Sequence, residues 1–273
     1  MIHLFCALKC EANPLRDEYR LQPHGDAQLF RIYTSDRQDL SLTVSGVGKL
    51  AMAAAVTYTA ALLGASRRDG ALNVGIAGHG DLPMASAALV NKITDAGSGK
   101  TWFPQIVFDS PLPRLPLLTV DQPAPDYPDR VLYDMEAAGF YDGASRVMTA
   151  ELVQCFKIVS DNRLHPAERI DQSLVSRLVS GNLETIDAVI RQMAQLAEQA
   201  CPADGMREVH DALTSRWHFT RTESLRLKQV LNRWQILLPA VSPVSLLPEK
   251  PGSGTEILAR LQTALDETPL SFE

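Results

Sequence analysis

Short apolar runs alternate with helix-like segments over the first 200 residues, and this alternation is the strongest constraint on the fold. Runs typical of buried strands cover residues 2–9, 29–34, 40–45, 72–77, 89–94, 101–108, 117–120, 131–134 and 153–159. Helical patterns occupy residues 50–63, 135–148 and 183–200. Strands that alternate with helices predict an α/β fold, with a central sheet covered by helices on both faces.

The character of the sequence changes near residue 202. Helical patterns cover residues 207–217, 222–237 and 255–266, and a segment rich in Pro, Ser and Gly separates the last two. We therefore predict two parts, an α/β domain over residues 1–202 and a helical C-terminal extension over residues 203–273.

Composition and charge argue against several classes of protein. A net charge of −6 disfavours binding to nucleic acid or to a membrane surface. No apolar run approaches the roughly 18 residues that span a bilayer, and the N-terminal run lacks the basic lead of a signal peptide. The four cysteines are irregularly spaced, which argues against a zinc site and favours free thiols in the cytoplasm. We expect no metal and no cofactor.

Three glycine-rich segments are candidates for ligand contact. The segment at 94–101, TDAGSGKT, ends like a P-loop but has Thr94 where that motif needs glycine and a β-rich stretch where it needs a helix. We predict a hairpin turn there. SGVGK, which begins at Ser45, and NVGIAGHGD, at 73–81, each follow or end a predicted strand. Their glycines would let the backbone approach a ligand, or simply form tight turns. His79 is better explained as a turn residue than as a catalytic one.

Three acidic residues follow predicted strands. Glu11 comes after the first strand, Glu136 lies where a strand passes into a helix, and Asp161 ends the apolar run at 153–159. The carboxyl ends of strands line the ligand crevice of an open α/β sheet, so the three side chains are expected to meet. Met135 and Glu136 together offer an apolar surface beside a bidentate acceptor, which suits a sugar. Each acid also has a simpler explanation, as a helix-terminal residue, a cap or an exposed side chain.

Taken in order, these segments resemble the nucleoside phosphorylase family, especially its 5′-methylthioadenosine/S-adenosylhomocysteine nucleosidase branch. The resemblance extends from residue 2 to about residue 200. It rests on five short motifs: ExxxLR from Glu11, SGVGK from Ser45, NVGIAG from Asn73, DMEA from Asp134 and VSD ending at Asp161. It implies a mixed central sheet flanked by helices, and a small-molecule nucleoside as ligand.

The resemblance also implies roles for single residues. Asp161 would protonate N7 of a purine, and Ser160 would orient Asp161. Glu136 would hold the ribose hydroxyls, with Met135 packed under the sugar. Glu11 would activate water. Such a set suits an oxocarbenium-like transition state, which needs an acid at the base and negative charge at the sugar. The remaining pocket residues would be Ser45, Ile76, Ala77 and Gly78.

The sequence leaves two nucleophiles open, water and phosphate. Phosphorylases of the family commonly carry an arginine just before the central glycine turn, but the segment at 72–75 reads LNVG, and Glu11 would repel phosphate. Both points favour hydrolysis, although Arg16, Arg31 and Lys49 could serve a phosphorylase.

Two departures from the family pattern bear on activity. Ile76 replaces the serine usual in the nucleosidases, and the segment at 104–135 is shorter than in the family. A nucleoside-binding protein without turnover is therefore a further alternative. The resemblance also implies a homo-oligomer, specifically a dimer.

Overall fold

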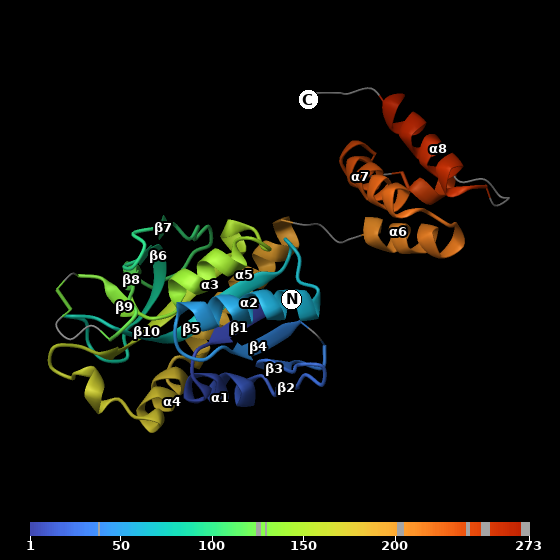
Figure 1. Ribbon diagram of the computed structural model, residues 1–273. Coiled ribbons are helices and arrows are strands. Elements are labelled where there is room, and N and C mark those ends of the chain that lie inside the picture. Colours follow the sequence, from blue (N-terminus) through green and yellow to red (C-terminus); the bar gives the residue numbers. More distant parts are fainter. Residues whose placement is uncertain are drawn as a thin grey trace. The chain divides into compact units, whose positions relative to one another are not determined.

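The computed structural model describes residues 1–37, 39–123, 127–128, 130–200, 205–238, 241–246 and 252–268. The chain divides into two compact units, Met1–Cys201 and Pro202–Glu273 (Figure 1). Among the described residues, no helix is both long and apolar enough to cross a membrane.

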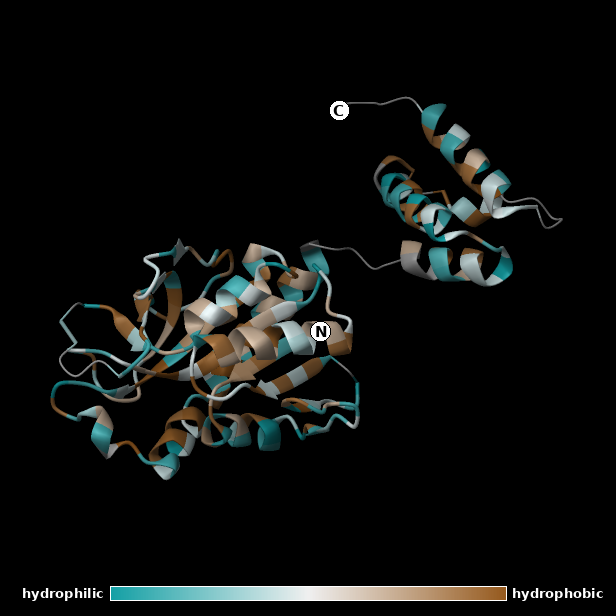
Figure 2. Cartoon of the chain, viewed as in Figure 1, coloured by the Kyte–Doolittle hydropathy of each residue, from teal (hydrophilic) through white to brown (hydrophobic). Residues whose placement is uncertain are grey.

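The first unit is built on a sheet to which the described residues contribute ten strands. In chain order these are β1 (Ile2–Cys6), β2 (Gln22–Pro23), β3 (Arg31–Thr34), β4 (Leu40–Val44), β5 (Gly70–Gly78), β6 (Ala87–Asp95), β7 (Thr101–Trp102), β8 (Arg114–Thr119), β9 (Leu132–Asp134) and β10 (Val153–Asp161). Parallel and antiparallel pairs both occur, which confirms the mixed sheet. Hydrophobic residues predominate in its central strands (Figure 2).

The sheet closes on itself at one end. β10 pairs with β5 on one side and with β6 on the other, so that β5, β10, β6, β8 and β9 form a ring. β1 and β4 continue the sheet from β5, and all three run parallel to β10. The carboxyl ends of β1, β4, β5 and β10 therefore lie along one edge, where ligands bind in such folds.

Helices cover both faces of the sheet, as predicted. They are α1 (Lys9–Glu18), α2 (Lys49–Leu63), α3 (Ala137–Ala144), α4 (Gln172–Ser180) and α5 (Leu183–Ala200). One hydrophobic core contains buried residues of α1, α4 and α5, and a second contains those of α2 and α3. α2 and α3 approach so closely that a Cβ on Gly139 would collide with the Lys49 carbonyl, so only glycine fits there.

Several local predictions need correction. The first strand ends at Cys6 instead of residue 9, because α1 begins at Lys9. The strand predicted at 101–108 shrinks to Thr101–Trp102, since Pro104 lacks the N–H that a strand ladder needs. α1, α4 and β2 were not predicted. The hairpin turn at 95–100 is confirmed, because β6 and β7 pair antiparallel around it.

The second unit is helical in its described part, with α6 (Gly205–Arg216), α7 (Arg221–Leu237) and α8 (Gly254–Asp266). A capping box of Thr220 and Glu223 begins α7, and the Ser253 side chain caps α8. Trp234 is fully buried in the core of this unit and donates its indole N–H to the Val241 carbonyl at 2.7 Å. The unit therefore has a hydrophobic core of its own.

Candidate active site

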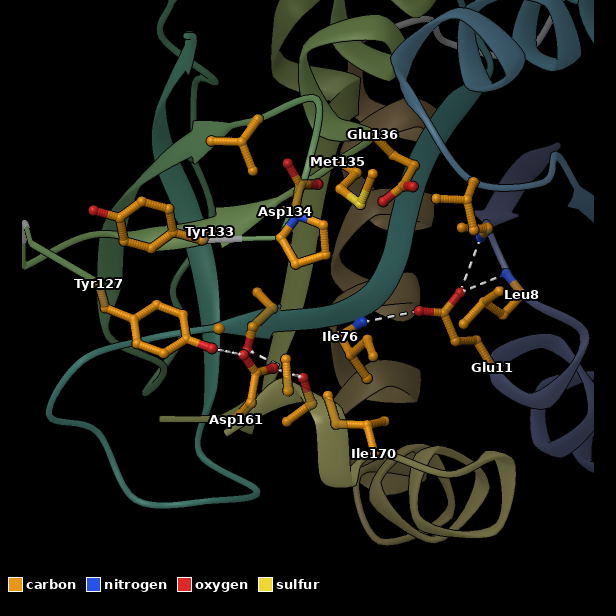
Figure 3. A pocket seen from close by; sticks show the side chains of 18 residues that line it. Leu8, Glu11, Ile76, Tyr127, Tyr133, Asp134, Met135, Glu136, Asp161 and Ile170 are labelled. Carbon is orange, nitrogen blue, oxygen red and sulfur yellow. Dashed lines mark hydrogen bonds between the residues drawn. The ribbon is translucent and has the colours of Figure 1, made fainter. Parts of the chain in front are cut away.

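One pocket lies at the carboxyl-end edge of the sheet and gathers most of the predicted site residues (Figure 3). Its lining includes Glu11, Ile76, Ala77, Gly78, Met135, Glu136, Ser160 and Asp161. Ser45 is predicted to be part of the site but is not among the lining residues. Its buried hydroxyl donates to the carbonyls of Cys6, at 3.3 Å, and Gly46, at 2.7 Å, which fixes the turn after β4.

Glu11 enters the pocket from the first turn of α1 and is 2% exposed. Its Oε2 accepts the N–H of Ala7 at 2.9 Å and of Leu8 at 2.8 Å, and its Oε1 accepts the N–H of Ile76 at 3.0 Å. Burial raises the pKa of Glu11, and the three N–H donors oppose part of that rise. The carboxylate thus has a fixed orientation and an increased basicity.

Glu136 lies between β9 and α3 and links two of the sequence motifs. Its Oε1 accepts the N–H of Gly48 at 2.7 Å, which joins the turn after β4 to the segment before α3. Gly48 has φ 103°, a conformation that side chains disfavour, and this orients its N–H. Burial, followed by the charge of Asp134, raises the pKa of Glu136 to about 7. This carboxyl group therefore titrates near neutral pH.

A buried ion pair lies beneath these carboxylates. Lys157, in the middle of β10, places its Nζ 2.9 Å from Oδ2 of Asp134, and both side chains are at most 1% exposed. Burial alone would lower the pKa of Lys157, but the neighbouring carboxylates, Asp134 foremost, raise it. Sequence reasoning missed Lys157, although a lysine inside an otherwise apolar strand signals a buried partner. Gly75 makes room, since a Cβ there would lie 3.1 Å from Glu11 Oε1 and 3.4 Å from Lys157 Nζ.

Asp161 ends β10 at an irregularity in its pairing with β5. Its Oδ1 accepts the Ser160 hydroxyl, and its Oδ2 accepts the hydroxyl of Tyr127 (Figure 3). The Tyr127 contact was not predicted, because residue 127 lies outside every predicted strand and helix. Both carboxylate oxygens of Asp161 therefore accept a hydrogen bond from a side-chain hydroxyl.

No protein-family model matches the sequence, and no curated protein matches it. Solved structures do match the fold of the chain. The 5′-methylthioadenosine/S-adenosylhomocysteine nucleosidase of S. pneumoniae has a TM-score of 0.57 at 15% identity, covering 70% of this chain and 99% of that chain. The 5′-methylthioadenosine nucleosidase of Arabidopsis thaliana has a TM-score of 0.57 at 18% identity, covering 69% and 95%. The futalosine hydrolase of Helicobacter pylori has a TM-score of 0.55 at 12% identity, covering 70% and 97%.

The chain has the nucleoside phosphorylase and hydrolase fold. The expected fold class is thereby confirmed. At these identities the likeness concerns the fold, and the chemistry follows from the pocket of the first unit itself.

The cations suggested for phosphate binding lie outside the pocket lining of the first unit. Lys49 is paired with Asp95 at 2.7 Å and with Asp121 at 2.9 Å. Arg16 binds the neighbouring Asp17, and Arg31 is exposed on β3. Among the described residues that line the pocket, four are acidic and none is Lys, Arg or His. The described lining therefore offers no cationic side chain to a phosphate.

His79 has the structural role that its sequence context indicated. Its Nδ1 accepts the backbone N–H groups of Asp81 and Leu82, each at 3.0 Å, and burial lowers its pKa. The ring therefore stabilises the turn after β5, and His79 is not among the lining residues of the pocket.

No group of three His, Cys, Asp or Glu side chains suited to a metal ion occurs in the part of the chain that the structure describes.

Proposed function

We propose that the protein hydrolyses the N-glycosidic bond of a purine nucleoside. The observation that carries this proposal is the convergence of Glu11, Glu136 and Asp161 in one pocket without a cationic side chain in its described lining. The transition state of N-glycosidic cleavage carries positive charge on the sugar and negative charge on the leaving base. A pocket with carboxylates at the sugar and an acid at the base stabilises both.

At the base, protonated Asp161 donates to N7 while the C1′–N9 bond breaks and its electron pair leaves with the purine. Ser160, through its hydrogen bond to Asp161 Oδ1, holds the carboxyl group in position. A general acid of this kind contributes on the order of 10²–10⁴ in rate. The base leaves as a neutral molecule instead of an anion.

On the opposite side of the sugar, Glu11 accepts a proton from water as the water oxygen bonds to C1′. Its basicity, increased by burial, suits this role because general bases work best with a pKa near the operating pH. One proton leaves Asp161 and one reaches Glu11, so the reaction balances as nucleoside plus water to free base plus free sugar. The acidic lining disfavours phosphate as the nucleophile.

The direct test is a nucleoside panel incubated with and without phosphate, with free base measured by chromatography. The panel contains methylthioadenosine, S-adenosylhomocysteine, adenosine, inosine and guanosine. Base and free ribose without phosphate would support the proposal. Strict phosphate dependence would establish a phosphorylase instead, and binding without base release would establish a nucleoside-binding protein.

Ribose binding is expected to depend on pH through Glu136. A carboxyl group with pKa about 7 is ionised above that pH and protonated below it. Only the ionised form accepts two ribose hydroxyls, so KM should rise about tenfold from pH 8 to pH 6. The variant Glu136→Gln should have a higher KM that hardly changes over this range. The same pH dependence of KM in both proteins would contradict the assignment.

We further propose a homodimer that acts in the cytoplasm. The cytoplasm fits the three described cysteines, Cys6, Cys10 and Cys155, which are buried thiols. Light scattering after gel filtration should give twice the chain mass of 29.9 kDa. A mass near 29.9 kDa at micromolar concentration would contradict the dimer.

A further inference from the structure

Tyr127 forms a hydrogen bond with Asp161, the acid of the proposed reaction. Its side chain is 3% exposed, lines the pocket and points at Asp161 (Figure 3). The phenol hydroxyl donates to Asp161 Oδ2, while Ser160 donates to Oδ1. A purine N7 needs an oxygen of this carboxyl group. The hydroxyl of Tyr127 takes the oxygen that Ser160 leaves.

Specific contacts hold Tyr127 in this position. Its φ is 42°, in the left-handed region that tyrosine rarely adopts. Arg163 donates to the Tyr127 carbonyl at 2.7 Å and also forms an ion pair with Asp81. The ring contacts Tyr133 edge-on with centroids 5.6 Å apart. The surroundings of Tyr127 therefore offset an unfavourable backbone.

The floor of the pocket is shaped to accept this ring. A Cβ on Gly78 would collide with the Tyr127 ring and with the Asp161 carboxylate. Only glycine at this position lets the ring and the carboxylate meet above the end of β5. Tyr127, Asp161 and Gly78 thus form one tightly fitted contact on the base side of the pocket.

We propose that Tyr127 is an internal competitor for Asp161, which the nucleobase must displace in order to bind. This inference rests on the proposed function, because it takes Asp161 as the residue that binds N7. The apparent dissociation constant of such a base equals its intrinsic value divided by the fraction of protein in which Asp161 is free of Tyr127. Tyr127 therefore weakens the binding of every base that bonds to Asp161.

The test compares binding of formycin A to the wild-type protein and to Tyr127→Phe by titration calorimetry. Formycin A has a carbon–carbon glycosidic bond, so turnover does not affect the readout. Phenylalanine keeps the ring but removes the hydroxyl, so Asp161 loses the partner that the base must displace. The Kd should fall at least fivefold. Weaker or equal binding by Tyr127→Phe would overturn the inference while leaving the proposed function intact.

Two controls assign the effect to Asp161. Tyr19→Phe removes a comparable bond, from Tyr19 to Asp187 at 3.3 Å, away from the pocket and should leave Kd unchanged. In an Asp161→Asn background the second acceptor oxygen is absent, so Tyr127→Phe should change Kd less than twofold. An equal gain in both backgrounds would show that Tyr127 does not act through Asp161. If neither wild type nor Tyr127→Phe binds formycin A or any nucleoside of the panel, the proposed function itself fails.

Discussion

Replacing Asp161 with asparagine is expected to lower kcat for nucleoside hydrolysis about 10³-fold while the protein stays folded. Asparagine has nearly the same shape and still accepts the hydrogen bond from Ser160. It cannot give a proton to N7, so the base must leave as an anion. The expected loss lies within the range on the order of 10²–10⁴ for a general acid. Single-turnover measurements at saturating nucleoside would isolate this step.

The matched control for that variant is Asp142→Asn. Asp142 lies in α3 and pairs with Lys100 at 2.6 Å and with Arg146 at 2.9 Å. It is not among the lining residues of the pocket, so kcat should change less than twofold. Circular dichroism spectra of both variants should match the wild type. Activity above one tenth of wild type in Asp161→Asn would remove Asp161 from the acid role.

The positions of Glu11 and Asp161 could be predicted from sequence because topology constrains them. They follow β1 and β10, which both run parallel to β5, and the carboxyl ends of parallel strands share one edge. Glu136 follows β9, which pairs antiparallel with β5, so this rule does not account for its place in the pocket. The rule needs no knowledge of side-chain packing. Strand positions were predictable for a similar reason, since burial on both faces leaves long apolar runs such as the one in β10.

The contacts that the sequence did not reveal depend on tertiary packing. Tyr127 lies in a segment without periodicity, and its left-handed backbone is held by Arg163, 36 residues later. The partnership of Lys157 with Asp134 spans 23 residues between two strands that do not pair with each other. α1 was missed because Pro14 lies inside it, although tertiary contacts of Leu15 stabilise the helix. Local patterns do not encode such pairings.

The second large effect is expected on the stability of the protein, when the buried Lys157 is replaced. Lys157→Met is expected to lower the free energy of unfolding by about 3–5 kcal/mol, the usual cost of removing one partner of a buried ion pair. Asp134 would remain with 0% of its side chain exposed and without a cation. Burial and the negative charges of Asp134 and Glu11 already raise the pKa of Glu136, so the loss of positive charge should also push that pKa higher.

Urea unfolding of three proteins would test this expectation. Lys100→Met removes an exposed lysine that pairs with Asp142, and such surface pairs contribute only about 0–1 kcal/mol. The double variant Lys157→Met/Asp134→Asn should recover at least half of the lost stability. Asparagine needs no cation and can still accept the hydroxyl of Thr119, which lies 2.8 Å from Asp134. If Lys157→Met costs no more than Lys100→Met, the pair does not stabilise the fold. In that case KM of Lys157→Met should still change, because Lys157 lowers the pKa of Glu136.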